Sequence, residues 1–237
     1  MVIPLKVACG LVLGTSACAP RAATVQGGGI RDLYTFFGYV AAVIFVIVVS
    51  LIGWSILRYR AKPGDDELPK QTKTNVRLEI VWFVIPQIIV VVLFLVSAGV
   101  LGDVNRRSPD PDVRVAVQGF QWGWRFSYEG SGVRIVSSSQ QPAALVLPVD
   151  KTISFTLTSQ DVAHSFYVPR FLMKRDTIPG KTNRVDITID EAGTYVGKCA
   201  EFCGLLHEEM EFTLEAVKGD EFEQWLSEQR GALDGDG

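Results

Sequence analysis

Residues 35–57 read TFFGYVAAVIFVIVVSLIGWSIL, a run without a single charged side chain. Residues 80–101 form a second run of this kind, IVWFVIPQIIVVVLFLVSAGVL. A helix needs roughly 20 apolar residues to cross the hydrocarbon core of a bilayer, and both runs exceed that length. Buried helices of a soluble protein would need a polar face, which neither run has. The sequence therefore predicts two membrane-spanning helices, the second of which tolerates Pro86.

The segment between the two runs, residues 58–77, is short and rich in Lys and Arg. It carries six basic side chains against three acidic ones. Short basic loops stay on the cytoplasmic side of a membrane, because translocating their positive charge is disfavoured. We therefore expect this loop in the cytoplasm, both ends of the chain outside, and residues 34–102 as a transmembrane hairpin.

Residues 1–17 are typical of a signal peptide, with a basic residue, an apolar stretch and then small side chains. The small side chains stand directly before Cys18, an order that resembles a bacterial lipoprotein signal, in which the cysteine is lipidated. A plain cleaved leader and an uncleaved one are the alternatives. Residues 18–33 are expected to be an extracytoplasmic spacer, in which Gln26-Gly27-Gly28-Gly29 indicates flexibility. A leader of this kind requires the same orientation as the basic loop.

Residues 103–237 contain short β-like runs separated by turn signals, which predicts an all-β domain outside the membrane. Seven such strands argue for a Greek-key sandwich or barrel. A closing helix is expected over residues 220–230. The expected strands cover residues 113–117, 121–126, 144–147, 152–158, 182–189, 193–199 and 211–217.

Charge is distributed unevenly along the 237 residues, whose formal net charge is −3. Residues 1–102 hold nine Lys and Arg against five Asp and Glu, whereas residues 103–237 hold 14 against 21. The acidic excess of the second part disfavours nucleic-acid binding and favours a basic partner.

The stretch CAEFCGLLHEEM, which begins at Cys199, is the densest group of metal-binding side chains. The chain holds only two His, four Cys and three Met, so any metal site would need nearly all the soft and nitrogen ligands. Cys199, Cys203, His207 and Met210 follow the spacing C-x3-C-x3-H-x2-M. The other histidine, His164, follows a predicted strand, and in a Greek-key sandwich its loop can meet this stretch.

Several kinds of site fit these residues. A Cys199–Cys203 disulfide is natural outside the cytoplasm, but it leaves both histidines and Met210 unexplained. A Cys2His2 zinc site has little use for the thioether, which favours copper. A mononuclear blue-copper site needs only one cysteine, and covalent haem needs a C-x-x-C-H motif that the sequence lacks. Two thiolates suit two bridged copper ions.

Over residues 30–230 the sequence resembles subunit II of the haem–copper cytochrome c oxidases. The resemblance implies a two-helix membrane hairpin in a bacterial plasma membrane and a cupredoxin-like domain on its outer side, with a dinuclear copper centre called CuA. It rests on the two apolar runs and on four motifs: the stretch from Cys199 to Met210, His164 in Asp-Val-x-His-Ser, Ile178-Pro179-Gly180 after Lys174-Arg175-Asp176, and Gln121-Trp122-Gly123-Trp124.

Carried over by this resemblance, Cys199 and Cys203 bridge both coppers as thiolates. His164 and His207 each complete one copper, and Met210 is a weak axial ligand of one of them. No haem is expected on this chain.

Three further roles follow from the resemblance. Glu201 gives its backbone carbonyl to the other copper, while its carboxylate reaches a Mg ion shared with subunit I; taken alone, it would be a solvated loop charge. Trp122 matches the tryptophan that receives the electron from cytochrome c, and Trp124 is expected in the core. The alternative is that both are core residues, as most tryptophans are. Glu79 matches the carboxylate at the mouth of a proton channel; the alternative is a helix-start carboxylate with Asn75 as cap.

The resemblance implies the electron-accepting subunit of a proton-pumping cytochrome c oxidase. Its partners would be subunit I, further oxidase subunits, the bilayer and a cytochrome c, either soluble or membrane-bound in a supercomplex, but no nucleic acid. Asp161 matches an acidic docking position of the family, whereas Ser127 stands where some relatives are acidic. A quinol-oxidase subunit II, which lacks the copper ligands, and a copper-storage or copper-delivery membrane protein are the alternatives.

Overall fold

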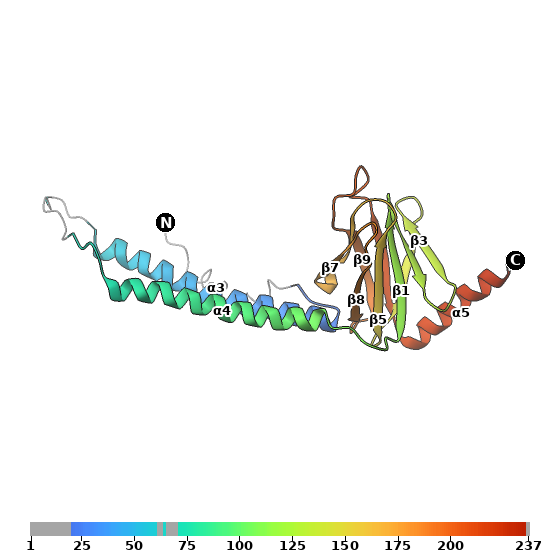
Figure 1. Cartoon of the computed structure of the whole chain (residues 1–237), viewed down its shortest axis with the longest axis horizontal. Coiled ribbons are helices and arrows are strands. Elements are labelled where there is room, and N and C mark those ends of the chain that lie inside the picture. Colours follow the sequence, from blue (N-terminus) through green and yellow to red (C-terminus); the bar gives the residue numbers. More distant parts are fainter. Residues whose placement is uncertain (1–19, 61–63, 65–70, 236–237) are drawn as a thin grey trace. The chain divides into compact units, whose positions relative to one another are not determined.

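The computed structural model describes residues 20–60, 64 and 71–235; the predicted signal peptide and Cys18 lie outside them. Two long helices are followed by a domain of short strands and a closing helix (Figure 1). The chain divides into two compact units. One contains Asp32–Val100, and the other contains Pro20–Arg31 together with Leu101–Gly237.

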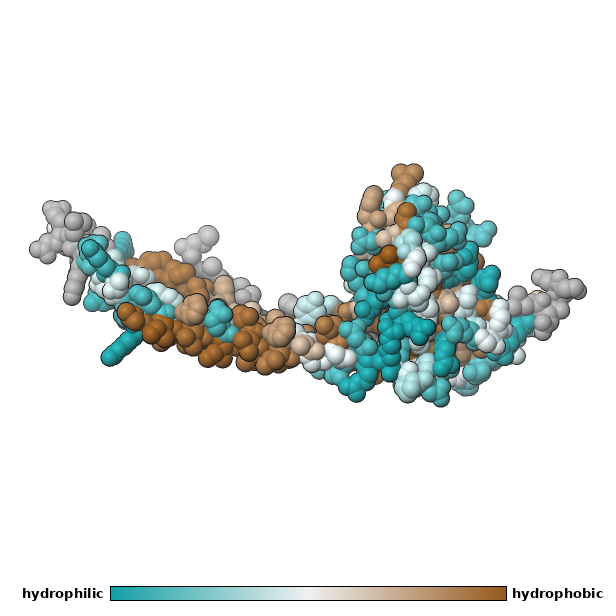
Figure 2. Space-filling view, in the orientation of Figure 1, coloured by the Kyte–Doolittle hydropathy of each residue, from teal (hydrophilic) through white to brown (hydrophobic). Residues whose placement is uncertain are grey.

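The two predicted spans lie within helices α3 (Val25–Arg58) and α4 (Val76–Val104). Both helices are long and apolar enough to cross a bilayer. Their large apolar side chains face outward on all sides, so hydrophobic surface runs along both helices in Figure 2. Such a surface is stable only in a non-aqueous environment, as expected for a membrane hairpin.

Helix α4 begins with a reciprocal cap. The side chain of Asn75 accepts the backbone N–H of Leu78 at 3.2 Å, and Glu79 Oε1 accepts the backbone N–H of Asn75 at 3.1 Å. These bonds satisfy N–H groups that have no partner within the helix. Glu79 therefore has a structural contact at the helix start, as the capping alternative predicts.

The second unit is a sandwich of two five-stranded sheets, in the orders β3-β2-β1-β5-β8 and β4-β10-β9-β6-β7. Neighbouring strands are antiparallel except for the parallel pairs β1–β5 and β4–β10. The strands are β1 (Val113–Phe120), β2 (Gly123–Tyr128), β3 (Arg134–Ser138), β4 (Ala144–Pro148), β5 (Thr152–Ser159), β6 (His164–Val168), β7 (Met173–Thr177), β8 (Asn183–Thr188), β9 (Gly193–Cys199) and β10 (Glu211–Val217).

Aromatic side chains join the two sheets. Phe212 of β10 contacts Trp124 and Phe126 of β2 across the sandwich, with ring centroids 5.7 and 5.2 Å apart. Phe166 of β6 stacks on Phe212 at 5.1 Å. Helix α5 (Gly219–Gly235) adds Phe222 to the same core. The predicted membrane hairpin followed by an all-β domain is thus confirmed, and Trp124 is a fully buried core residue as expected.

The backbone before α3 pairs with the β domain. Ala23 N–H donates to the carbonyl of Arg170 at 2.8 Å, and Ala23 O accepts the N–H of Asp190 at 3.2 Å. Thr24 is buried and forms an antiparallel bridge with Ile189, just after the edge strand β8. Its hydroxyl accepts the N–H of Gly27 at 3.0 Å and so caps α3. The glycines predicted to be flexible are instead the first turn of a helix, because a sheet edge offers backbone partners that sequence composition does not reveal.

Candidate metal centre

The register of two neighbouring strands brings the predicted ligands together. Strand β6 begins at His164 and β9 ends at Cys199, and the two strands pair antiparallel. The loop that leaves β9 returns to β10 after Met210, whose carbonyl accepts the N–H of Cys199 at 3.0 Å. The N–H of Ala200 donates to the carbonyl of Ser165 at 3.0 Å. These bonds hold the ligand loop against the start of β6.

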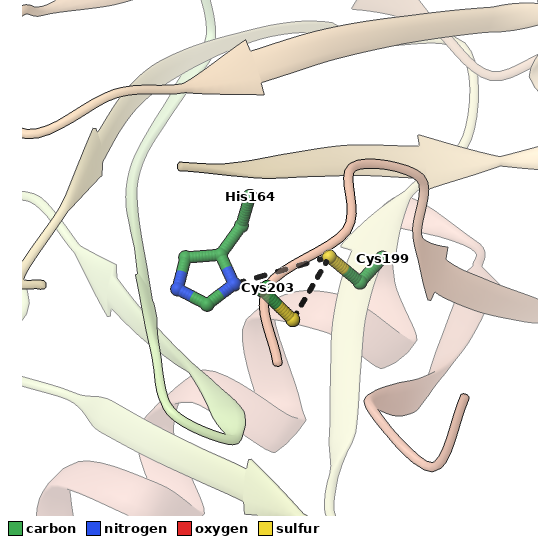
Figure 3. A group of neighbouring side chains, drawn as sticks. All are labelled: His164, Cys199 and Cys203. Atoms are coloured by element: carbon green, nitrogen blue, oxygen red, sulfur yellow. Dashed lines mark hydrogen bonds between the residues drawn. The ribbon is translucent and has the colours of Figure 1, made fainter. Parts of the chain in front are cut away.

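Two thiols and one imidazole lie at the centre of the site (Figure 3). Cys199 Sγ is 3.8 Å from Cys203 Sγ and 3.9 Å from His164 Nδ1. A disulfide would bring the sulfurs to about 2.0 Å, so the pair is not a disulfide. The ligand atoms of these three buried residues all lie within 4.8 Å of one another, close enough to hold a metal ion.

Three more donors surround the two thiols. His207 Nδ1 and Met210 Sδ lie 3.5 and 3.8 Å from Cys203 Sγ. The carbonyl oxygen of Glu201 lies 3.2 Å from Cys199 Sγ. Each cysteine is thus accompanied by one histidine and by one weaker donor. The structure brings together all six groups that the sequence singles out as ligands.

The donor set fits copper. Bonds of about 2.0–2.3 Å to a shared ion leave neighbouring donor atoms roughly 3–4 Å apart, as they are around Cys199 and Cys203. Thiolate and thioether donors together favour copper over harder metals. Four of the donor residues are buried: Met210 is 1% exposed, His164 is fully buried, and both cysteines are buried as well.

Burial and hydrogen bonding shift the pKa values of the central groups. Burial would raise the pKa of the Cys199 thiol, but hydrogen bonds with His164 and the backbone of Glu201 and Ser165 outweigh it and lower that pKa. Burial and the adjacent charge of Cys199 raise the pKa of the Cys203 thiol. For His164, burial lowers the pKa, but its interactions with Cys199 and Asp161 have the larger combined effect and raise it.

Trp122 lies beside the cluster, in the turn before β2 rather than on the strand that the sequence predicts. Its indole N–H donates to the carbonyl of Cys203 at 3.3 Å. Gln121 donates to the same carbonyl at 2.8 Å, and its backbone N–H donates to Asp161 at 2.7 Å. The sequence alone predicts no role for Gln121 and only a docking role for Asp161; the Gln-Trp motif and the spacing Asp-x-x-His are the signals that point to these contacts.

The remaining predicted residues lie outside this cluster of donor atoms. The Glu201 residue is exposed, and it is its backbone carbonyl that contacts the Cys199 thiol. Glu79 belongs to α4, in the helical unit. Cys18 is not among the described residues.

Comparisons with known proteins agree along most of the chain. Residues 113–217 match the family model described as cytochrome c oxidase subunit II, periplasmic domain, and residues 15–100 match its transmembrane domain. The chain is 34% identical to probable cytochrome c oxidase subunit 2 of Streptomyces avermitilis, covering 92% of this chain and 84% of that protein. It is 39% identical to cytochrome c oxidase subunit 2 of Alkalihalophilus pseudofirmus, covering 79% of this chain but 54% of that longer protein.

Among solved structures, the periplasmic domain of subunit II of cytochrome oxidase of Bradyrhizobium japonicum is 29% identical, with a TM-score of 0.49. The match covers 53% of this chain and 99% of that one. Because the two family models match the helical segment and the domain that carries the ligands, and the Streptomyces avermitilis protein matches 92% of the chain, the chain belongs to the cytochrome c oxidase subunit II family.

Proposed function

We propose that this chain accepts electrons from a cytochrome c at a dinuclear copper site, CuA, and passes them to the haem–copper site of subunit I in a respiratory oxidase. The convergence of four further donors on two thiols supports it most strongly, because a zinc site or a mononuclear copper site leaves several of these six groups unused. The proposed ligands are His164, Cys199, Cys203, His207, Met210 and the carbonyl of Glu201.

Copper, when bound, supplies a one-electron acceptor. The protein contributes a rigid setting, since the ligands are attached to paired strands and a hydrogen-bonded loop. Ligands that do not move when the charge changes keep the reorganisation energy of electron transfer low.

Trp122 is proposed to receive the electron. The hydrogen bond from its indole to the carbonyl of Cys203 supports this role, because it connects the ring to the ligand thiol through one hydrogen bond and the few covalent bonds of Cys203. The indole is partly exposed, so a docked donor can reach it. Phe202 and Leu205, on the neighbouring ligand loop, are 79% and 85% exposed and offer an apolar contact surface.

The donor is proposed to be a basic cytochrome c. The β domain belongs to the acidic part of the chain, and opposite charges accelerate encounter between proteins. Asp161 lies beside Gln121 and adds negative charge next to the tryptophan. Steering of this kind weakens as ionic strength rises.

The remaining roles complete the proposal. The exposed carboxylate of Glu201 would bind Mg together with subunit I, and Glu79 would stand at the mouth of a proton channel used in proton pumping. The signal peptide would be removed, Cys18 lipidated, and the copper domain placed outside the bacterial plasma membrane. The basic loop and the small residues before Cys18 support this topology.

Rapid mixing of the copper-loaded full-length chain with reduced cytochrome c tests the proposal. We expect fast copper reduction that slows with added salt and with Trp122→Phe. Trp225→Phe is the matched control, because Trp225 packs against Tyr128 and Phe222 in the α5 region. Equal rates for both variants would contradict the role of Trp122, and no reduction of the wild type would contradict the proposed function.

A further inference from the structure

The carboxylate of Asp161 joins two segments beside the metal centre. Its Oδ1 lies 2.9 Å from Nε2 of His164 and accepts the N–H of Val162 at 2.7 Å. Its Oδ2 accepts the backbone N–H of Gln121, also at 2.7 Å. One carboxylate therefore bonds both the loop that leads into β6 and the turn between β1 and β2.

The contact with Asp161 determines which nitrogen of His164 can bind a metal. A neutral imidazole carries one N–H, and a carboxylate beside Nε2 holds the proton there. Nδ1 then keeps its lone pair and faces Cys199, 3.9 Å away. The ring has little freedom to turn, because it is fully buried and a Cβ added to Gly119 would lie only 2.9 Å from its Cδ2.

Gln121 contacts the ligand loop, which carries Cys203. Its side-chain amide donates to the carbonyl of Cys203 at 2.8 Å, and the Trp122 indole donates to the same oxygen at 3.3 Å. A carbonyl with two donors is held in one orientation, since turning the peptide would break both bonds. The turn between β1 and β2 thus bonds the Asp161 segment and the ligand loop at once.

We propose that Asp161 and Gln121 are positioning residues of the copper centre, Asp161 by holding His164 with Nδ1 toward the metal and Gln121 by holding the peptide of Cys203. The inference rests on the proposed function for the identity of the metal. Neither residue is a ligand. Both act on ligands through hydrogen bonds, in the way that outer partners of metal-bound histidines set the tautomer and ring orientation.

The first test uses the metal-free full-length chain, labelled with ¹⁵N-histidine. The sequence contains two histidines, so His207→Gln leaves the ring of His164 as the only signal. At a pH where the ring is neutral, we expect the Nε2–H form in the wild type and a mixture of both forms in Asp161→Ala. An unchanged Nε2–H form in Asp161→Ala would contradict the role of Asp161, whatever metal the site binds.

The second test uses the copper-loaded chain and follows copper loss to EDTA. Removing an outer partner of a metal ligand costs roughly 10–100-fold in metal affinity, and we expect faster loss of that order in Asp161→Ala. Asp161→Asn should be intermediate, because its amide oxygen can still accept from His164 while its NH2 group faces the N–H of Gln121. The matched control is Asp110→Asn. This substitution also removes one negative charge, but from a side chain that is 96% exposed.

Gln121→Met removes the amide donor at nearly constant size and charge. We expect altered copper hyperfine couplings and an altered potential at unchanged copper stoichiometry, whereas Gln224→Met on α5 should match the wild type.

If Asp161→Ala and Gln121→Met both match their controls in copper loss and spectrum, the proposal is wrong. Thermal unfolding of the metal-free variants identifies a variant that has not folded. If Asp161→Ala does not fold, copper loss from Asp161→Asn decides whether Asp161 positions His164. A wild type that binds no copper would overturn the proposed function but not the tautomer test.

Discussion

At the scale of single residues, the two thiols differ in how readily they lose a proton. The pKa of Cys199 is lowered and that of Cys203 is raised, so the metal-free pair loses its two protons in separate steps, the second of them at high pH. A metal that binds both sulfurs must displace the second proton. Copper affinity should therefore rise with pH until the pH passes the raised pKa of Cys203. Competition titrations from mildly acidic to mildly alkaline pH measure this, and an affinity that falls over the same range would contradict it.

Substitutions of different ligands should change the copper centre in different ways. Cys203 Sγ lies within 3.8 Å of Cys199 Sγ, His207 Nδ1 and Met210 Sδ, so Cys203→Ser should abolish the spectrum of an electron shared between two coppers. Met210 contributes a neutral thioether, and Met210→Leu should leave two coppers bound with a changed potential. Electron paramagnetic resonance of both loaded variants distinguishes the cases. An unchanged spectrum in Cys203→Ser would show that its thiolate does not bridge.

At the scale of elements, the start of α3 depends on one close backbone contact. A Cβ added to Gly27 would lie 2.7 Å from the carbonyl of Phe171 and 2.8 Å from Thr24 Oγ1, whereas one added to Gly28 meets nothing within 4 Å. Gly27→Ala should thus destabilise the β domain by about 1–3 kcal/mol, the usual cost of overpacking. Gly28→Ala should stabilise the helix by about 0.5–1 kcal/mol.

Thermal unfolding of the two glycine variants, followed by near-ultraviolet circular dichroism of the core aromatics, checks this prediction. The two substitutions add the same methyl group to adjacent residues of one helical turn, so a common effect on the helix cancels. Equal midpoints would contradict the close contact inferred at Gly27.

Helix α4 allows a test of the two roles considered for Glu79. Glu79→Gln keeps an oxygen that can accept the N–H of Asn75, so the capping contact survives while the ionisable group is lost. If Glu79 feeds a proton channel, turnover of the assembled oxidase should fall while copper reduction by cytochrome c stays fast. Asn75→Ala, which removes the cap but not the carboxylate, is the control. Normal turnover in Glu79→Gln would leave the cap as its only supported role.

At the scale of the whole molecule, the sequence was sufficient for both membrane helices, for the all-β domain and for every group now found in the donor cluster. The three strands it missed have physical reasons. Strands β3 and β7 are the outer strands of their sheets and carry exposed or charged side chains, as in Met173–Thr177, so the alternation of a half-buried strand is lost. Strand β6 is short and begins with the buried polar residue His164.

The contacts made by Asp161, Gln121 and Thr24 could not be predicted from the sequence. Each is a hydrogen bond between segments that are distant along the chain, such as Gln121 with Cys203 or residues 23–24 with Ile189 and Asp190. No local periodicity encodes such a bond, because it depends on the register of strands that pair elsewhere. The position of Trp122 in a turn has the same origin, since β1 and β2 end their pairing at Phe120 and Gly123.

The proposed copper pair rests on six donor groups, the thiols of Cys199 and Cys203 and the four groups around them. Copper content and electron paramagnetic resonance of the full-length chain, purified in detergent and loaded with copper, test it most directly. We expect two coppers per chain and hyperfine structure from one unpaired electron shared equally between two copper nuclei. One copper with the spectrum of a mononuclear blue site, a preference for zinc, or Cu(I) binding without any mixed-valence state would contradict it.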